Sequence, residues 1–408
     1  MNNGVVEMGL NLIPAGYKQT EVGVIPEDWE VITFGNVMSI RHGKNQQQIE
    51  SKNGLYPILA TGGQIGWGNS YLWNKPSVLI GRKGSINKPR YCDTPFWTVD
   101  TLFYSEISHQ VDAKFTYYKF CMIDWMQYNE ASGVPSLNAR TIENVLAAYP
   151  AKKEQTAIAN ALSDVDALIS ELEKLIAKKQ AIKTATMQQL LTGRTRLPQF
   201  ALREDGSKKS TKQSELGEIP EDWEVDSIGN LISITTGSRN TQDRIEEGVY
   251  PFFVRSQTVE RINTFSFDGE AVLTAGDGVG TGKVFHYING KFDFHQRVYL
   301  MYNFGEIIDG YFFYIYFSNN FYDRIMSMTA KSSVDSVRRE MIADMKMLLP
   351  TKKEQTAIAT ILSDMDEEIQ ALKQRLSKTR QIKQGMMQEL LTGKTRLVQP
   401  LNKESQHG

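Results

Sequence analysis

The sequence has little of what would tie the protein to a membrane, to secretion or to metal chemistry. Its 408 residues include only two cysteines, and Cys92 and Cys121 are too isolated for a disulfide framework or for the paired Cys/His spacing of a zinc site. No apolar run approaches the about 18 residues of a transmembrane helix. The first residues, MNNGVVEMGLNLIPAG, lack the basic start and long apolar core of a signal peptide. We therefore expect a cytoplasmic protein of two or more domains.

The chain also lacks an excess of charge of either sign. Its 46 Lys and Arg residues face 47 Asp and Glu residues, which gives a net charge of −1. Proteins that coat nucleic acid without regard to sequence usually carry a basic excess. Any nucleic-acid surface on this chain must therefore be local.

Catalytic and cofactor motifs are missing as well. There is no Asn-Pro-Pro or Asp-Pro-Pro motif of the kind found in amino-methyltransferases. The glycine-rich run Ala275–Lys283 fails as a phosphate-binding loop, because Asp277 replaces its first glycine and Val284 replaces its Ser or Thr. His286 and His295 have no paired carboxylates nearby in the sequence, so structural histidines are the expected interpretation. We predict no catalysis by this chain alone, no metal site and no bound cofactor.

What the sequence does contain is a long helical repeat. Residues 152–197 return as residues 352–397 with about 26 of 46 positions identical, most densely in KKEQTAIA and LLTG. Apolar residues recur at alternating steps of four and three, which predicts a coiled-coil seam. The predicted seam consists of Ile158, Leu162, Val165, Ile169, Leu172 and Ile176, matched by Ile358, Leu362, Met365, Ile369, Leu372 and Leu376. A helix from Lys152 to Thr192 would be roughly 60 Å long.

The ends of the two helices carry recognisable signals. Thr351 and Glu354 form a capping-box pattern, in which hydroxyl and carboxylate each bind a free backbone N–H, whereas the first copy has Ala151 in place of the hydroxyl residue. Gly193 and Gly393 are placed to end the helices in the left-handed conformation.

The middle of each helix departs from the apolar pattern. Lys179 and Thr379 fall on the seam, and Ile182 and Ile382 follow them. We expect a kink or a break in the pairing there, with the apolar register resuming at the two isoleucines.

A second repeat precedes each variable region. KQTEVGVIPEDWEV at 18–31 returns as KQSELGEIPEDWEV at 212–225. Proline disfavours helix in these segments, and Trp29 and Trp223 offer large apolar faces. We expect each motif to be a packing plug where a domain meets its helix; a direct ligand role for the tryptophans is the alternative.

Between the motifs and the helices lie two variable domains, which we predict to be α+β. Ser77–Ile80 and Ala271–Thr274 have the composition of strands, and Phe115–Met126 and Tyr311–Met326 that of aromatic-faced helices. The expected boundaries are 1–17 for a lead-in, 18–150 for the first domain, 151–197 for the first helix, 198–215 for a polar linker, 216–350 for the second domain, 351–397 for the second helix and 398–408 for a tail.

The two variable domains share a weak order of features. Each has a Tyr-Pro pair, then a glycine-rich loop, then a serine-containing segment before the long helix. These are Tyr56-Pro57 and Tyr250-Pro251, 81–85 and 276–280, and 132–134 and 333–334. Two domains of one fold have thus diverged on scaffolds that have not.

The order IPEDWE, variable domain, KKEQ helix and LLTG-x-TRL, repeated once, resembles the specificity subunit of type I restriction-modification systems. The resemblance covers about 18–397. It implies two target-recognition domains joined by two antiparallel helices, each domain reading one half of a bipartite asymmetric site on double-stranded DNA. It also implies two modification (methyltransferase) subunits that use S-adenosylmethionine and, optionally, two restriction subunits that use ATP and Mg²⁺. Asp335 stands where the first half has Pro135, so the halves are not interchangeable.

Symmetry supports the same interpretation independently. Antiparallel pairing of a tandem repeat relates its halves by a pseudo-twofold axis, and duplex DNA has a twofold pseudo-symmetry of its own. The helix length would then act as a ruler for the spacer between half-sites. A structural adaptor that binds no DNA is the alternative, and diverged domains on near-identical helices argue against it. A fused recognition and methylation enzyme lacks both the motifs and the length.

Loops that combine glycine with Arg, Lys, Ser and Asn are the expected DNA contacts, because glycine lets backbone N–H groups approach phosphates and arginine can bind guanine bidentately. In the first domain they are Arg82, Lys83, Ser85, Lys88, Ser136, Asn138 and Arg140. In the second they are Arg239, Asn240, Arg255, Ser256, Lys283, Lys331, Ser332, Ser333, Arg338 and Arg339. Arg82 and Arg338 are expected to read bases, and Lys331 to hold a phosphate.

Overall fold

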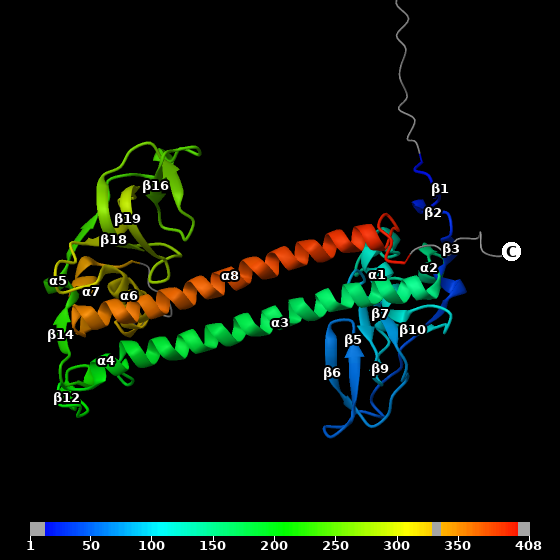
Figure 1. The fold of residues 1–408 in the computed structure, drawn as a ribbon, viewed down its shortest axis with the longest axis horizontal. Coiled ribbons are helices and arrows are strands. Elements are labelled where there is room, and N and C mark those ends of the chain that lie inside the picture. The colour runs from blue at the N-terminus through cyan, green and yellow to red at the C-terminus, as the bar shows by residue number, and fades with distance from the viewer. Residues whose placement is uncertain (1–12, 329–335, 399–408) are drawn as a thin grey trace, which may run out of the picture. The chain divides into compact units, whose positions relative to one another are not determined.

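The structure is a computed structural model that describes residues 13–328 and 336–398. It divides into two compact units, one formed by residues 1–173 with 374–408 and the other by residues 174–373. The two long helices α3 (Lys152–Leu191) and α8 (Lys352–Leu390) each contribute to both units (Figure 1). Each unit thus combines one mixed α/β domain with a segment of each helix, as the sequence predicted for the fold class.

The domain of the first unit has a four-stranded and a three-stranded sheet, beside two sheets of two strands each. β4 (Met38–Arg41), β10 (Leu102–Ile107), β7 (Ser77–Gly81) and β8 (Arg90–Cys92) form an antiparallel sheet in that order, and β6 (Gly63–Gly68), β5 (Tyr56–Ala60) and β9 (Trp97–Thr98) form a second. The remaining elements are β1 (Tyr17–Thr20), β2 (Gly23–Pro26), β3 (Glu30–Thr33), η1 (Phe34–Asn36), α1 (Ala113–Met122), η2 (Trp125–Tyr128), α2 (Ala139–Glu143) and β11 (Leu146–Tyr149). The strand predicted at Ser77–Ile80 is confirmed, and its residues are buried.

The domain of the second unit has one larger sheet. β15 (Ser233–Thr236), β20 (Val298–Tyr302), β18 (Phe267–Ala275), β19 (Phe285–Phe294), β16 (Tyr250–Phe253) and β17 (Glu260–Ile262) follow one another in that order. The other elements are α4 (Pro198–Ala201), β12 (Thr211–Ser214), β13 (Gly217–Pro220), β14 (Glu224–Ser227), α5 (Ile228–Leu231), η3 (Thr241–Asp243), α6 (Gly310–Ser327), α7 (Arg339–Ala343) and β21 (Lys346–Leu349). α4 and β12 fall within the segment predicted to be a linker.

One strand of the second domain, β19, corresponds to two strands of the first domain, β8 and β9. β19 pairs with β18 and, at its end, runs parallel to β16, whereas in the first domain β8 pairs with β7 and β9 runs parallel to β5. The break between β8 and β9 contains Pro95, which has no N–H to offer a neighbouring strand. The two domains therefore share one topology, and the first sheet is split where the second is continuous.

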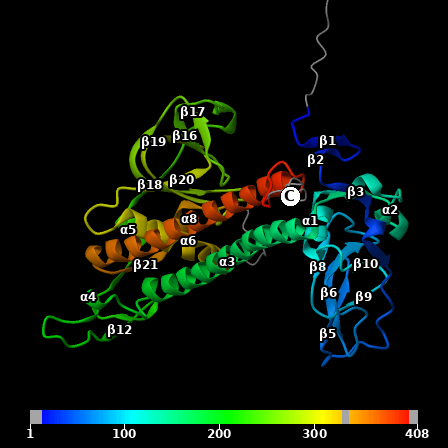
Figure 2. The ribbon, with the colours of Figure 1, turned by 45° about the vertical axis from the view of Figure 1, so that its right-hand side comes forward.

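In each unit an aromatic helix lies between the sheet and the long helices. Asp309 starts α6 by accepting a hydrogen bond from the Phe312 N–H, and Phe317 stacks on Phe321 with ring centroids 4.4 Å apart. The core of the second unit joins residues of α6 to Val272 of the sheet and to Ile358 of α8. Figure 2 shows α6 beside α8. In the first unit, α1 holds the same position.

The helix predicted at Phe115–Met126 ends earlier than expected. α1 stops at Met122, and the Asp124 carboxylate accepts a hydrogen bond from the Met126 N–H, 3.1 Å away, to start η2. Aspartate competes with the helical backbone in this way, which is why it favours caps over helix interiors.

Within each unit the segments of α3 and α8 run antiparallel, side by side (Figure 1). In the first unit Ile158 and Leu162 share a core with Leu390 and Leu391. In the second, Ile358 and Leu362 share a core with Leu190 and Leu191. The seam residues Val165, Ile169, Met365, Leu372 and Leu376 are half-buried, and Leu172, Ile176 and Ile369 are buried.

The expected break in the middle of the helices is wrong. Both helices are continuous through these positions, and Lys179 pairs with Glu368 across the second unit at 2.7 Å. In the first unit Arg380 and Glu173, which are not the repeat equivalents of that pair, form an ion pair at 2.6 Å. Ion pairs thus continue the seam where the apolar residues stop.

The apolar register does not resume at Ile182 and Ile382, which are 42% and 49% exposed. The residue that follows each isoleucine, Lys183 or Lys383, instead reaches Asp366 or Asp166 on the facing helix. The lysine side chains occupy the positions that the isoleucines were expected to take.

The two glycines that end the helices are confirmed in the left-handed conformation. Gly193 has φ +70° and Gly393 has φ +75°. A Cβ on Gly193 would lie 2.6 Å from the Pro220 ring, and one on Gly393 would lie 2.5 Å from the Pro26 ring. Each LLTG motif therefore packs directly on an IPEDWE motif of its own unit.

The IPEDWE tryptophans act as the predicted packing plugs. Trp29 and Trp223 are fully buried, each beside the glycine that ends a long helix. Arg396 binds both Glu154, with Nε to Oε1 2.6 Å, and Asp28, with Nη1 to Oδ1 2.9 Å. In the second unit the corresponding arginine binds Glu354 and Asp222 in the same way.

The capping box predicted for α8 is only half formed. The Glu354 N–H donates to the Thr351 hydroxyl at 3.4 Å. The Glu354 carboxylate, however, accepts hydrogen bonds from Arg196 and from the Trp223 Nε1–H, so it does not return to the residue that starts the helix. Its burial and its ion pair outweigh the capping role that its spacing suggested.

Lys119 is half-buried and packs against the end of α8. Its ammonium donates to the Leu391 carbonyl at 2.6 Å and lies 5.4 Å from the centroid of the Trp29 ring. Burial lowers the pKa of Lys119 to about 7, compared with about 10.4 in an unfolded chain.

This lysine predicts a pH dependence of stability. Between about pH 7 and pH 10 the unfolded chain holds a proton that the folded chain has released, so raising the pH favours folding by up to about 1.4 kcal/mol per pH unit. Lys119→Met should remove this slope. Urea unfolding of both proteins from pH 7 to pH 9 measures it, and parallel stability curves would contradict the assignment.

Candidate nucleic-acid interface

In the first domain, the polar loops gather where the strands end at one edge of the sheet. β7 ends at Gly81 opposite the start of β10 at Leu102. The Arg82 N–H then donates to the Thr101 carbonyl at 2.8 Å, and the Leu137 N–H donates to the Arg82 carbonyl at 3.0 Å. Segments that are far apart in the sequence are thereby fixed side by side.

The loop after β7 carries four of the predicted contacts. Gly84 turns it with φ +87°, and Lys83 forms a bridge with Ser136. Arg82, Lys83, Ser85 and Ser136 therefore lie together. Lys83, Ser85 and Lys88 are exposed, whereas Arg82 is partly covered and pairs with Asp100 at 2.6 Å.

Asn138 has a structural role at this edge. Its Oδ1 accepts a hydrogen bond from the Thr141 N–H at 2.8 Å, which caps α2, and its Nδ2 donates to Glu130 at 2.5 Å. Its amide is therefore committed within the domain. Arg140, on the first turn of α2, is exposed.

The second domain repeats this arrangement with different side chains. β18 ends at Ala275, Gly278 turns the loop with φ +82°, and Asp277 forms a bridge with Ser336 as Lys83 does with Ser136. The Val337 N–H donates to the Gly276 carbonyl at 2.7 Å. Lys83 in one domain is thus replaced by an aspartate in the other, on the same backbone frame.

Arginines cluster around that aspartate. Arg255 reaches Asp277 Oδ1 with its Nη1 at 2.8 Å, and Arg297 reaches Oδ2 at 3.3 Å. Arg239, on the loop after β15, pairs through Nε with Asp293 at 3.0 Å. The structure thus brings Arg239 and Arg255 to the edge at which their strands end.

The other predicted contacts of the second domain surround this cluster. Asn240 is exposed and accepts a hydrogen bond from Gln296 at 2.6 Å. Ser256 is exposed, and Lys283 lies over the Tyr322 ring at 5.4 Å. Arg338 and Arg339 are exposed at the start of α7. The predicted Lys331, Ser332 and Ser333, with the segment 333–334, lie outside the described residues.

Sequence reasoning missed Asp100, Gln296, Arg297 and Asp293. The first three fall just before strands β10 and β20, at the edge where the predicted loops gather. A search for polar residues at every strand boundary, rather than beside glycine alone, would have found them. Asp293 lies inside β19, where nothing in the sequence marks it.

The two histidines of this domain are buried and bound to the backbone. The His286 Nε2 lies 3.1 Å from the Ser256 carbonyl, and the His295 Nδ1 accepts a hydrogen bond from the Arg297 N–H at 2.9 Å. Burial lowers the pKa of both imidazoles. Among the described residues, no group of three or more His, Cys, Asp or Glu side chains could hold a metal ion.

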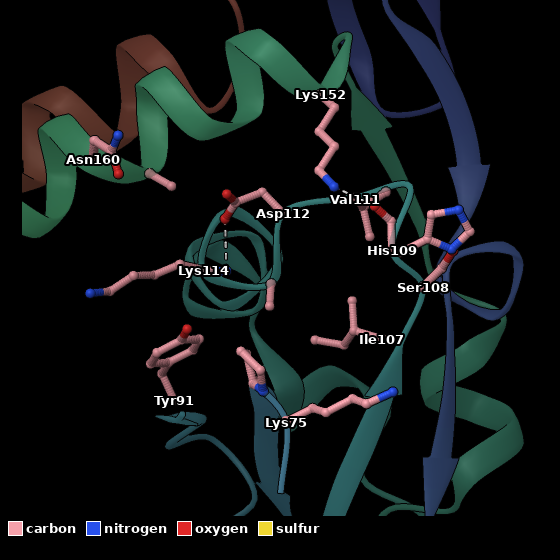
Figure 3. A pocket seen from close by; sticks show the side chains of 13 residues that line it. Lys75, Tyr91, Ile107, Ser108, His109, Val111, Asp112, Lys114, Lys152 and Asn160 are labelled. Atoms are coloured by element: carbon pink, nitrogen blue, oxygen red, sulfur yellow. Dashed lines mark hydrogen bonds between the residues drawn. The ribbon is translucent and has the colours of Figure 1, made fainter. Parts of the chain in front are cut away.

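A pocket of about 690 Å³ in the first unit lies where α1 meets α3 (Figure 3). Lys152 reaches the His109 carbonyl, and the Gln155 Oε1 accepts a hydrogen bond from the Asp112 N–H at 2.8 Å. In the second unit Lys352 and Gln355 make the same two contacts, with Gly305 and Asp309. The pocket is therefore part of the joint that the KKEQ motif makes with its domain.

Within the described residues, no helix combines the length and the apolarity that a membrane crossing requires.

A family model described as the type I restriction modification DNA specificity domain matches the chain twice, over residues 26–184 and 220–381. The chain belongs to this family. Each match contains one variable domain and most of the long helix that follows it. The internal repeat is thus a tandem pair of specificity domains.

Curated relatives of the chain are named as specificity subunits of type I restriction enzymes. The type I restriction enzyme MjaVIII specificity subunit of Methanocaldococcus jannaschii is 26% identical, over 91% of this chain and 94% of its own. The type I restriction enzyme EcoDI specificity subunit of Escherichia coli is 32% identical, over 43% of this chain and 38% of its own. The crystal structure of the type I restriction-modification S subunit from M. genitalium shares the fold, with a TM-score of 0.66 and 16% identity over 89% of this chain and 96% of that one.

Proposed function

We propose that each domain of this specificity chain reads one half of a bipartite, asymmetric site on duplex DNA, and that the long helices set the spacer between the halves. The observation that carries the proposal is the repeated loop frame. Gly84 and Gly278 turn the same loop, and Ser136 and Ser336 bridge to it in the same way. The side chains on that frame differ, as two readers of different sequences require.

The clustered arginines and exposed lysines supply the local positive charge that the balanced sequence called for. Arg255 and Arg297 face one aspartate, which leaves an excess of positive charge at the edge of the second domain. In the first domain Lys83 and Lys88 are exposed on one loop. Such charges hold the DNA backbone, while side chains that reach the base edges select the sequence.

Arg82 and Arg338 are expected to read bases. Replacing either with alanine should weaken binding to the preferred half-site by about 1–3 kcal/mol and relax the preference at one base pair. Lys88→Ala should instead weaken binding to all sequences alike and flatten the salt dependence. Binding to a panel of half-site variants separates the two results, and uniform loss from all three substitutions would contradict base reading.

We further propose that the chain is not catalytic by itself and that it assembles with two modification subunits and, optionally, two restriction subunits. In such a complex the modification subunits use S-adenosylmethionine and the restriction subunits use ATP and Mg²⁺. The names of the relatives, as specificity subunits of type I restriction enzymes, support this assignment. A DNA-reading subunit works where the DNA lies, so we propose a cytoplasmic location.

Co-expression tests the division of labour. The chain together with a modification subunit should methylate adenine, whereas the isolated chain should not. Methyl transfer by the isolated chain would overturn the proposal. A complex that binds DNA with a cognate site no better than DNA without one would favour the adaptor alternative.

A further inference from the structure

The loops that carry Arg239, Arg255 and Asp277 gather at one edge of the second domain, which we call the interface edge. Asp293 is a buried carboxylate beneath this edge. It is fully buried in β19, yet it has four hydrogen-bond donors. The Thr264 and Ser266 hydroxyls donate to it at 2.8 Å each, the Phe294 N–H donates at 3.1 Å, and the Arg239 Nε–H donates at 3.0 Å. Burial by itself would raise the pKa of Asp293, but the hydrogen bonds from Ser266, Thr264 and Arg239 outweigh it and lower the pKa. The group is therefore a fixed negative charge at neutral pH.

This carboxylate orients Arg239. The arginine side chain is 38% exposed. Among the described residues, its side chain donates a hydrogen bond only to Asp293, through Nε. A guanidinium is planar, and one that is held through Nε leaves both terminal amino groups out of that contact. Those two groups are the fork that matches paired acceptors such as O6 and N7 of guanine.

The neighbouring arginines are held differently. Arg255 and Arg297 each direct a terminal nitrogen, Nη1, at Asp277. Each of these two arginines therefore has one terminal amino group already bound to a carboxylate, so it has fewer free donors for a bidentate contact with a base than Arg239 has. Of the three arginines, Arg239 alone combines a buried anchor with a free terminal pair in this arrangement.

The anchor is specific to the second domain. Asp293 pairs with Phe252 in the parallel register of β19 and β16. The matching position in the first domain, opposite Ile58 of β5, holds Trp97, whose Nε1 donates to the Lys44 carbonyl at 2.9 Å. A charged anchor in one reader and an indole in the other is a difference at a matching place in the two folds.

We propose that Arg239 recognises a guanine of the second half-site through its two terminal amino groups, and that Asp293, held by Thr264 and Ser266, is its positioning residue. The inference rests on the proposed function, because it presumes that the second domain reads a half-site. It adds the base and the residue that reads it. The first half-site is read without this device.

The test uses the full chain in complex with its modification subunit and DNA in which each base pair of both half-sites is varied in turn. Arg239→Lys keeps the charge and loses the fork, whereas Arg239→Gln loses both. Both variants should lose about 10- to 100-fold of the discrimination at one G·C pair of the second half-site, with the first half-site unchanged. Arg239→Lys should keep the salt dependence of the wild type.

Asp293→Asn tests the positioning role. It should relax the preference at the same base pair, by less than Arg239→Gln does, without changing any other position. Thermal unfolding establishes that each variant is folded. If Asp293→Asn does not fold, Thr264→Ala is the milder variant, because it removes only one of the hydroxyls that hold Asp293. Arg203→Lys, which alters an arginine paired with Glu221 outside the interface edge, is the matched control and should leave recognition unchanged.

The outcomes separate the inference from the function beneath it. A wild-type complex without a bipartite preference would remove the proposed function itself. If the wild type reads two half-sites but Arg239→Lys keeps full discrimination, Arg239 is a phosphate contact and the inference is overturned. Loss of discrimination at an A·T pair, or equally at every position, would also overturn it.

Discussion

Replacing Arg196 with alanine is expected to lower the free energy of unfolding of the second unit by about 3–5 kcal/mol. The Arg196 side chain is 10% exposed and the facing Glu354 is 1% exposed. The substitution would leave the Glu354 carboxylate buried, with the Trp223 Nε1–H as its remaining hydrogen-bond donor among the described residues. An unpaired buried charge costs far more than a lost surface ion pair. Urea unfolding followed by tryptophan fluorescence measures the change.

Two controls make this result interpretable. Arg203→Ala removes an arginine of the same unit from an exposed pair with Glu221 and should change stability little. Adding Glu354→Gln to Arg196→Ala removes the orphaned charge and should recover part of the loss. If Arg196→Ala costs no more than Arg203→Ala, the contacts of Arg196 with Glu354 and Asp222 are not what joins the IPEDWE, KKEQ and LLTG-x-TRL motifs of this unit.

Inserting four residues after Lys179, matched by four after Thr379, is expected to change the preferred DNA spacer while leaving both half-sites as they were. Four helical residues add about 6 Å, and duplex DNA rises about 3.4 Å per base pair, so the spacer should lengthen by roughly two base pairs. The insertion points fall in the ion-paired part of the seam, where Lys179 and Glu368 replace apolar packing. This leaves the cores at the helix ends intact.

Mapping the methylated adenines made by the wild-type and lengthened complexes measures the spacer directly. A control insertion of four residues in the segment 203–210, which lies outside the helices, should change nothing. The ruler interpretation would be contradicted if the lengthened chain kept the original spacer, or if a half-site changed while the spacer did not.

The fold was largely predictable because its signals are local or repeated. Gly193 and Gly393 ended the helices as expected, since a left-handed terminus favours glycine. The prediction of the seam was wrong after Lys179, because whether Ile182 or Lys183 faces the partner helix depends on where Asp366 lies. The prediction that the Glu354 side chain completes the capping box was wrong for a similar reason, since its carboxylate binds Arg196, 158 residues away in sequence.

The candidate interface was predictable only in part. The loop of Arg82 and Lys83 and the segment of Ser136 were both named from the sequence, and the structure shows that they meet. Asn138 was predicted to contact DNA, but its side-chain amide caps a helix within the domain. Asp293 was invisible, because its significance comes from the burial of β19 beneath Arg239 and not from any spacing in the sequence.

The central claim is that one chain carries two separate readers of DNA sequence. The most direct test is to co-express it with a modification subunit and to map every methylated adenine in the genome of the host by single-molecule sequencing. The account predicts a single asymmetric motif made of two different half-sites separated by a spacer of fixed length and free sequence. A continuous motif, a palindrome, or methylation without sequence preference would contradict it.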